Sequence, residues 1–389
     1  MRANPGGTID PQDVVGRDEL IRRLWEILER QSVALVAERR MGKTCVTTKM
    51  KAKPPGEMLT VWQDLEGLRS PLEFVEAVFH EVEGHLTRRQ RIPAKVRKLL
   101  AEVSGAEFAG VRFPEIAAAH WKALLTKTME DLVDHEHRRI VFFWDELPLM
   151  LKNIKEHHGE GAAMELLDTL RAVRQTHKPI RMFFTGSVGL HNVITSLRKG
   201  GYVNAPINDM HVVELPPLAP DDAAELARKL LDGEGLSMGA DDTLPLVIAE
   251  AVDCIPYYIH HLVDEMSQGP ADFTPEAVRQ IVSRRLTDSQ DSWELDHYRT
   301  RINGYYDAKD RPFVLGLLDV LAGADGPLDF AELFNLLKSQ VATEDQERAR
   351  DLLTLLRRDH YVSQGPDGRF GFRYPLIQRW WRLNRGLTP

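Results

Sequence analysis

Short apolar runs alternate with amphipathic stretches over the first 216 residues of the chain. Polar or small residues follow each run, which is typical of strands buried on both faces of a parallel sheet. The predicted strands are Ser32–Val36, Leu59–Asp64, Ile140–Trp144 and Ile180–Thr185. The predicted helices are Asp18–Arg30, Lys43–Lys51, Pro71–His85, Pro114–His135 and Gly159–Gln175. This alternation predicts an α/β domain with a parallel sheet over residues 1–216.

The pattern changes at Leu215-Pro216-Pro217, because consecutive prolines sustain neither a helix nor an inner strand. After these prolines the apolar positions follow the helical period, and no further buried strand is indicated. The predicted helices are Pro220–Leu231, Thr243–Val252, Pro256–Met266 and Pro275–Leu286. We therefore expect a small all-helical domain over residues 217–290.

Residues 291–389 form a third predicted unit, which combines helices with a hairpin. Its helices are predicted at Pro312–Leu321, Leu328–Lys338 and Glu344–Asp359. The segments His360–Ser363 and Arg369–Arg373 flank the turn Gly365-Pro366-Asp367-Gly368, which is a hairpin signal. Three helices followed by a hairpin is the order of a winged-helix domain, and we expect that fold here.

The composition is that of an ordinary soluble globular protein. Of the 389 residues, 43% are hydrophobic and 28% are charged, and the formal net charge is −8. No apolar run approaches the roughly 18 residues that a membrane span needs, and Met1–Gly16 has no apolar core of a secretory signal. Two cysteines, Cys45 and Cys254, do not support a disulfide framework. We expect a cytoplasmic protein without membrane contact.

Two local basic runs stand out against the negative total. Residues 88–98 hold six basic side chains and no acid, and residues 366–389 hold five arginines against Asp367 alone. Such runs can meet the phosphates of a nucleic acid, and they can equally be solvated helix faces. Trp380 and Trp381 lie within the second run, where they could stack on bases or close the core of a small domain.

The clearest chemical signal is the segment 37–44, which reads Ala-Glu-Arg-Arg-Met-Gly-Lys-Thr and joins a predicted strand to a predicted helix. A strand, a loop ending in Gly-Lys-Thr and a helix together make the arrangement of a P-loop. Its backbone N–H groups and the helix N-terminus hold phosphates. We expect Lys43 to reach the β- and γ-phosphates and Thr44 to ligate Mg²⁺. The usual first glycine is replaced by Ala37, which fits if its φ is negative.

Acidic and hydroxyl side chains end two other predicted strands. The run Ile140–Trp144 is followed directly by Asp145 and Glu146. Because ligands of parallel sheets bind at the carboxyl ends of the strands, we expect Asp145 to hold Mg²⁺ through water and Glu146 to activate the attacking water. Thr185, or as second choice Ser187, could bond the γ-phosphate or the water from the next strand.

These motifs together resemble a known family. Val14-Val15-Gly16-Arg17-Asp18-Glu19-Leu20 resembles the V-G-R-x-x-E-L motif of AAA+-related signal-transduction ATPases (STAND) and of the allied archaeal-type ATPases, which are related to origin-recognition initiators. The segment 38–44 resembles the family's E-R-R-x-G-K-T. Trp144-Asp145-Glu146 and Phe184-Thr185-Gly186-Ser187 are similar to its second acidic motif and its sensor motif. Leu215-Pro216-Pro217-Leu218 is similar to the start of its helical lid.

The resemblance implies an α/β P-loop NTPase followed by a helical lid and a winged helix, and it adds expected contacts. It implies that Val15 and Gly16 lie against the base and ribose of a bound nucleotide. A lid motif G-x-P is represented by Cys254-Ile255-Pro256, which keeps the proline and lacks the glycine. Arg198 is the arginine that could reach the γ-phosphate of a neighbouring subunit. The full set of expected nucleotide-binding residues is Val15, Gly16, Arg39, Arg40, Met41, Gly42, Lys43, Thr44, Cys45 and Pro256.

Three classes of function follow from these motifs. The first is a Mg²⁺-dependent ATPase that acts as a switch and couples ATP binding and hydrolysis to a protein partner or to self-assembly. The second is an ATP-dependent DNA-binding module that uses the winged helix; its third helix, Glu344–Asp359, balances its arginines with acids, so DNA binding is expected to be weak. The third is an adaptor with vestigial nucleotide binding, which the intact Lys43, Asp145 and Glu146 argue against.

Overall fold

The computed structural model describes residues 1–56, 58–88, 94–104, 113, 115–186, 190, 193–195, 204–236, 243–269 and 274–387. The chain falls into two compact units. The first, which we call the sheet unit, comprises Asp18–Ala37 and Lys43–Leu215. The second, the helical unit, comprises Met1–Arg17, Glu38–Gly42 and Pro216–Pro389. Five residues of the predicted phosphate loop, Glu38–Gly42, thus pack with the helical unit.

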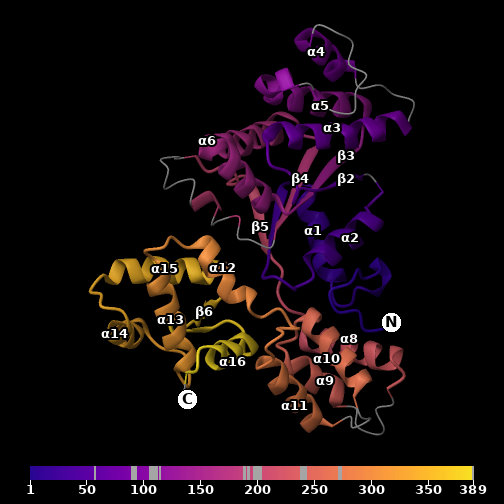
Figure 1. Cartoon of the computed structure of the whole chain (residues 1–389). Helices are drawn as coiled ribbons and strands as arrows, with labels where there is room; N and C mark the ends of the chain where they lie inside the picture. The colour runs from indigo at the N-terminus through magenta and orange to yellow at the C-terminus, as the bar shows by residue number, and fades with distance from the viewer. Residues whose placement is uncertain are drawn as a thin grey trace. The chain divides into compact units, whose positions relative to one another are not determined.

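The sheet unit is built on five parallel strands in the order β2-β3-β4-β1-β5 (Figure 1). The strands are β1 (Ser32–Val36), β2 (Met58–Asp64), β3 (Arg139–Asp145), β4 (Ile180–Gly186) and β5 (Met210–Glu214). The first four agree with the predicted runs to within a residue or two. The strand β5 was not predicted: it lies at the sheet edge, and His211 and Glu214 interrupt its apolar residues, so it lacks the continuous apolar run of an inner strand.

Helices surround this sheet. They are α1 (Asp18–Leu28), α2 (Lys43–Ala52), α3 (Pro71–Arg88), α4 (Ala94–Ser104), α5 (Trp121–His135) and α6 (Leu147–Thr176), with a 3₁₀ turn η2 (Glu115–His120) before α5. One prediction needs correction, and one helix was missed. The predicted helix Gly159–Gln175 is the second half of α6, which begins at Leu147 and kinks at Gly159, where φ is 86°. The helix α4 was not predicted, and buried Asp131 of α5 accepts hydrogen bonds from the backbone of Lys95 and Val96 at its start.

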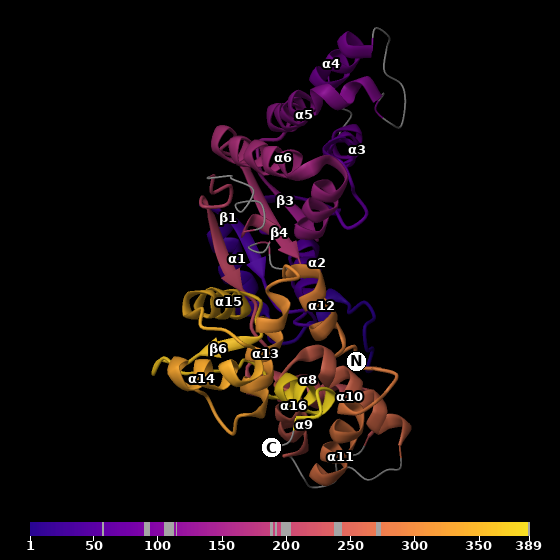
Figure 2. The same cartoon turned by 60° about the vertical axis from the view of Figure 1, so that its left-hand side comes forward.

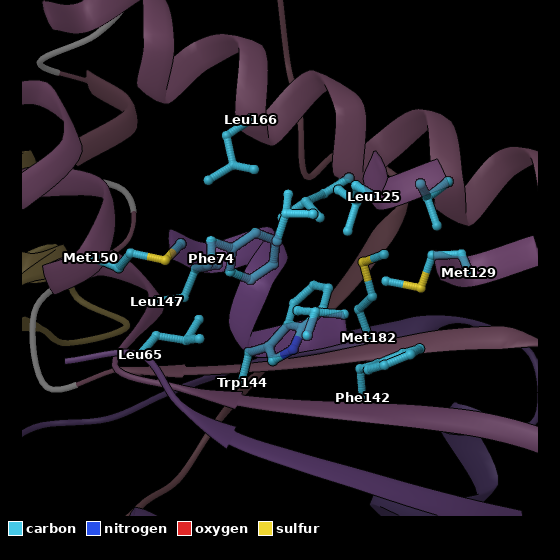
Figure 3. Packing of buried hydrophobic residues seen from close by; sticks show 14 of the residues in the cluster. Leu65, Phe74, Leu125, Met129, Phe142, Trp144, Leu147, Met150, Leu166 and Met182 are labelled. Carbon is cyan, nitrogen blue, oxygen red and sulfur yellow. The ribbon is translucent and has the colours of Figure 1, made fainter. Parts of the chain in front are cut away.

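The core of the sheet unit follows from the alternation of side chains along buried strands. Phe142 and Trp144 of β3 lie in one apolar cluster with residues of α3, α5 and α6, as Figure 3 shows. Phe143, between them in sequence, packs edge-on against Trp25 of α1 on the opposite face. Helices thus cover both faces of the sheet, and the strand ends remain as the places where polar side chains can gather.

The helical unit contains most of the remaining elements, which are seen best in Figure 2. These are the 3₁₀ turn η1 (Pro11–Asp13), α8 (Pro220–Gly233), α9 (Leu244–Ala251), α10 (Pro256–Gln268), α11 (Pro275–Leu286), α12 (His297–Tyr305), α13 (Arg311–Gly323), α14 (Phe330–Gln340), α15 (Gln346–Arg358), the antiparallel pair β6 (Val362–Gln364) and β7 (Phe370–Phe372), and α16 (Pro375–Asn384). The three predicted helices and the hairpin of residues 312–373 are present. The helices α12 and α16 were not predicted.

Helix α16 closes the core of the C-terminal part. Trp380 and Trp381 are 4% and 0% exposed, and Trp381 Nε1 donates to Asp319 Oδ1 of α13 at 2.8 Å. The aromatic pair therefore packs inside this part of the chain, so the alternative that it stacks on bases is wrong for this arrangement.

Candidate functional site

The carboxyl ends of β1, β4 and β3 meet at one edge of the sheet. Val36 of β1 is in register with Gly186 of β4, and Phe184 of β4 is in register with Trp144 of β3. The residues that follow, including Ala37 and Asp145, therefore lie at this edge, where parallel α/β sheets bind ligands.

Asp145 is the centre of the polar groups at this edge. Its side chain is largely buried, and its Oδ1 accepts a hydrogen bond from the Thr185 hydroxyl and one at 3.0 Å from the backbone N–H of Glu146. Both donors are neutral and both bond the same oxygen. A buried carboxylate whose second oxygen receives no hydrogen bond from a described residue is the type of ligand that a hard divalent cation takes. Asp145 therefore fits the predicted role of a metal ligand.

Glu146 occupies a constrained position directly after the strand. Its φ of 54° and ψ of 32° are left-handed, which is uncommon for a residue with a Cβ, and its carbonyl accepts the first backbone hydrogen bonds of α6. The side chain is half-buried at the N-terminus of that helix. This backbone turn places Glu146 directly after Asp145 at the carboxyl end of β3, at the place where the sequence predicts the water-activating base.

Lys43 and Thr44 lie at the other side of the same edge. Lys43 begins α2, is buried, and donates from Nζ to the Ala37 carbonyl at 3.0 Å, so the loop is closed across its own ends. Thr44 is exposed, and Cys45 is half-buried and in the free thiol form. Among the described residues with positive φ, the loop contributes Arg40 at 74° and Gly42 at 86°, whereas Ala37 is not one of them. Alanine at the first position is therefore compatible with the loop, as predicted.

The loop residues Glu38, Arg39 and Arg40 have ionic partners in the segment just before and within α12. Glu38 is fully buried and receives the Arg301 guanidinium at 2.7 and 3.0 Å, with His297 Nε2 at 3.8 Å. Burial alone would raise the pKa of Glu38, yet the charge and hydrogen bonds of Arg301 hold that pKa far below its ordinary value. Glu294 pairs with Arg40 and, at 3.7 Å, with Arg39.

The opening motif contacts the same loop. Gly16 has a φ of 67°, and a Cβ there would lie 2.6 Å from the Cβ of Asp222 in α8, so no other residue fits without a shift. Buried Arg17 donates to the carbonyls of Met41 at 3.1 Å and Pro217 at 3.5 Å. Val15 precedes Gly16 and is half-buried. Gly16 and Arg17 of this motif thus have a packing role in this chain, beside the base contact that the resemblance implies.

Pro256 starts α10, and the residues before it explain the departure from the G-x-P pattern. Cys254 adopts a φ of 56°, the left-handed conformation that glycine takes without strain. Its carbonyl accepts from the Leu218 N–H at 3.1 Å. The backbone turn of the motif is therefore kept although its glycine is replaced. Next to Pro256, the ring of Tyr257 lies 4.1 Å from the Arg40 guanidinium.

Two predicted residues, Arg198 and Ser187, lie outside the described residues, so their roles stay predictions. The residues that sequence reasoning missed are Glu294, His297 and Arg301. They lie in a stretch without a motif, and the one available signal was that their charges complement those of Glu38-Arg39-Arg40.

Most basic side chains of the two runs that the structure describes have partners within the protein. In the first run, Lys95 pairs with Asp134 at 2.7 Å and Arg97 with Glu83 at 2.5 Å. In the tail, Arg385 pairs with Asp319 at 2.6 Å, and Arg379 and Arg382 donate to backbone carbonyls. Side chains engaged in this way favour the solvated-face interpretation over a phosphate-binding one.

The described part of the chain lacks two features. Within it, no helix combines the length and apolar character that crossing a membrane requires. Nor do three or more His, Cys, Asp or Glu side chains of these residues gather into a group that could hold a metal ion. A site built from Asp145 and Thr44 would thus complete its coordination with a ligand or water.

The chain was compared with known proteins. No family model and no curated protein matches it. Among solved structures, it is similar to the Walker-type ATPase PABY2304 of Pyrococcus abyssi, with 16% identity and a TM-score of 0.64 over 95% of this chain and 97% of that one. It is also similar to the Aeropyrum pernix ORC2 protein in its ADPNP–ADP complexes, with 12% identity and a TM-score of 0.55 over 97% of both chains. The chain therefore has the fold of Walker-type and ORC-type ATPases, which confirms the α/β P-loop NTPase fold that its motifs predict.

Proposed function

We propose that this protein is a Mg²⁺-dependent ATPase of the AAA+-related STAND or archaeal type, in which the nucleotide state controls a partner contact or self-assembly. The observation that carries the proposal is the arrangement at the sheet edge. Buried Asp145, held by Thr185 and followed by Glu146, shares this edge with a loop that ends in Lys43. The fold shared with an ATPase supports the same conclusion.

The residues divide the chemistry among them. Lys43 leaves the Ala37 carbonyl and binds the β- and γ-phosphates, while the N–H groups of the loop and of the start of α2 hold the phosphate oxygens. Thr44 and Asp145 hold Mg²⁺, which when bound neutralises phosphate charge. Glu146 accepts the proton of the attacking water, and Thr185 keeps Asp145 oriented. Val15 and Gly16 border the base and ribose, as in the family that the motifs resemble, and Pro256 of the lid motif also contacts the nucleotide.

Calorimetric titration of ATP with Mg²⁺ tests the binding. The wild type is expected to bind, and Lys43→Ala is expected to lose binding because the phosphate charge loses its cation. Lys51→Ala is the matched control, since Lys51 lies on the exposed face of the same helix, where it contacts Trp62. Absence of binding by the wild type at millimolar ATP would contradict the proposal.

Residues 217–290 are proposed to act as the lid and residues 291–389 as a winged-helix domain that receives the signal. The three helices and hairpin of the latter support this assignment. If Arg198 acts on the γ-phosphate of a neighbouring subunit, specific activity rises with protein concentration, since such an arginine can contribute roughly 10³–10⁵ in rate. A specific activity that stays constant from nanomolar to tens of micromolar protein excludes action in trans.

A protein contact is favoured over DNA as the role of residues 291–389. In α15, Arg348 pairs with Asp310 and Arg350 with Glu347, so of its four arginines only Arg357 and Arg358, in the last turn, keep exposed donors for a groove. We expect weak DNA binding without sequence preference that falls steeply with salt. Fluorescence anisotropy with random and genomic duplexes at two salt concentrations measures it, and nanomolar, sequence-selective binding would favour the DNA-binding alternative instead.

A further inference from the structure

The three charged residues at the start of the phosphate loop meet a complementary set of charges. Glu38 pairs with Arg301 and His297, and both Arg39 and Arg40 pair with Glu294. We call the segment Glu294–Arg301 the clasp. The loop and the clasp belong to the same compact unit, although more than 250 residues separate them in sequence.

The two ion pairs that the clasp makes with the loop, Arg301 with Glu38 and Glu294 with Arg40, differ in burial. The Glu38 and Arg301 side chains are 0% and 10% exposed, and Arg301 also bonds the Tyr361 hydroxyl and the Asp359 carbonyl. Glu294 is 48% exposed. Separating Glu38 from Arg301 would leave a buried charge without its partner, whereas Glu294 can leave its arginines at a small cost in free energy. The first pair is therefore an anchor and the second is an exchangeable contact.

Glu294 is held in place by a tight turn. Asp291 and Glu294 both have left-handed backbones, with φ of 47° and 53°. The Asp291 carboxylate accepts the N–H groups of Leu295 and Asp296, and Trp293 is buried and donates from Nε1 to Glu265 at 3.0 Å. These contacts fix the backbone that carries Glu294 beside the loop arginines.

The carboxylate of Glu294 makes the kind of contact that a phosphate makes with arginines. Both are anionic oxygen groups that accept from guanidinium N–H donors. Arg40 has further capacity, because its buried Nε has no hydrogen-bond acceptor among the described residues. In the present arrangement the loop arginines face an internal anion, and Lys43 faces a carbonyl.

We infer that Glu294 is an internal competitor of the nucleotide phosphates for Arg39 and Arg40. Phosphate binding displaces Glu294, while the Glu38–Arg301 pair keeps the loop attached to α12. The presence of nucleotide in the loop therefore changes the contacts of the segment before α12, in the C-terminal part of the chain. This inference rests on the proposed function, because it names the regulation of the same loop.

Glu294→Gln tests the competition, because it removes the charge and keeps the shape. Isothermal titration with Mg²⁺ and ATP is expected to give about fivefold tighter binding than the wild type, which is what the loss of one partly exposed ion pair allows. The matched control is Glu276→Gln, which removes an exposed carboxylate paired with Arg279 and leaves affinity unchanged. Equal or weaker binding by Glu294→Gln than by the wild type overturns the inference.

A second measurement uses the unaltered protein, so it does not depend on how a variant folds. Hydrogen exchange is expected to show faster exchange of the amides of residues 294–297 when ATP and Mg²⁺ are bound, with α13 unchanged as the internal control. Unchanged or slower exchange at 294–297 overturns the inference while leaving the proposed function intact. If neither the wild type nor Glu294→Gln binds ATP, the proposed function fails, and the competition fails with it.

Discussion

Two buried carboxylates, one in the sheet unit and one in the helical unit, are stabilised in opposite ways. Asp145, at the sheet edge, is held by a threonine hydroxyl and a backbone N–H. Glu38, at the start of the loop, is held by a guanidinium in two hydrogen bonds. Neutral donors orient a carboxylate and leave its charge for a ligand, whereas a guanidinium cancels the charge. Asp145 is thus suited to chemistry, and Glu38 to holding parts of the chain together.

The largest expected effect tests the region around Asp145. Glu146→Gln should retain ATP binding and lose about 10²–10⁴ in turnover, because an amide cannot accept the proton of the attacking water. Single-turnover hydrolysis with saturating ATP measures this. Glu165→Gln, an exposed change on α6 that removes an ion pair with Lys122, is the control. Turnover within a factor of three of the wild type would show that Glu146 is not the base.

The next effect tests the region around Glu38. Arg301→Gln leaves Glu38 buried without its cation, which is expected to cost about 3–5 kcal/mol of unfolding free energy. Urea denaturation followed by tryptophan fluorescence measures it. Adding Glu38→Gln should recover part of the loss, since two neutral amides carry no unpaired charge. The exposed Arg279→Gln should cost less than about 1 kcal/mol; a similar cost for Arg301→Gln would remove the distinction between the two carboxylates.

How far the sequence predicts these regions depends on how local the signal is. The strands, the loop and the pair Asp145-Glu146 follow from runs and motifs within a few residues. The Glu38–Arg301 pair brings together residues 263 positions apart, and no local pattern at Arg301 indicates its partner. Helix α12 was missed for the same reason, because its buried residues Tyr298 and Ile302 stand among polar ones. Helix α16 was missed because its arginines and tryptophans were interpreted as part of a basic C-terminal tail.

A third effect concerns pH and uses a buried ring of the helical unit. Burial lowers the pKa of His260 to about 4, from an ordinary value of 6.5, and its Nδ1 accepts the Asn4 N–H. The unfolded chain binds a proton below about pH 6.5 and the folded protein does so only below about 4. Stability is therefore lost as the pH falls from 6.5 to 4, by about 3 kcal/mol from this group.

His260→Gln should remove that part of the pH dependence. Denaturation of the variant and the wild type at pH 7, 5.5 and 4.5 gives the difference between their free energies of unfolding at each pH. Contributions common to both proteins cancel in this difference; one of them is Asp253, whose pKa burial raises to about 6. The exposed His158→Gln is the control. A constant difference between His260→Gln and the wild type across this range would contradict the assignment of a neutral buried ring.

The smallest expected effect sharpens the role of the neutral donor. Thr185→Val keeps the shape of the side chain and removes the hydrogen bond to Asp145, and a hydrogen bond to a charged group contributes about 1.5–3 kcal/mol. Turnover should fall about tenfold at saturating Mg²⁺, and the Mg²⁺ concentration for half-maximal activity should rise. Thr169→Val, on the exposed face of α6, should change neither. An unaltered Mg²⁺ dependence would separate Thr185 from the metal ligand.

The Glu38–Arg301 pair also bears on how this protein can change over generations. A mutation at either position alone leaves one charge buried without its counterpart, so it is selected against, whereas a paired change can persist. Homologous chains should therefore vary at the two positions together, as one inherited unit. Where a homologue has lost the glutamate after its first P-loop residue, the arginine at the position of Arg301 is expected to be lost as well, and with it the dependence of the loop on the C-terminal half of the chain.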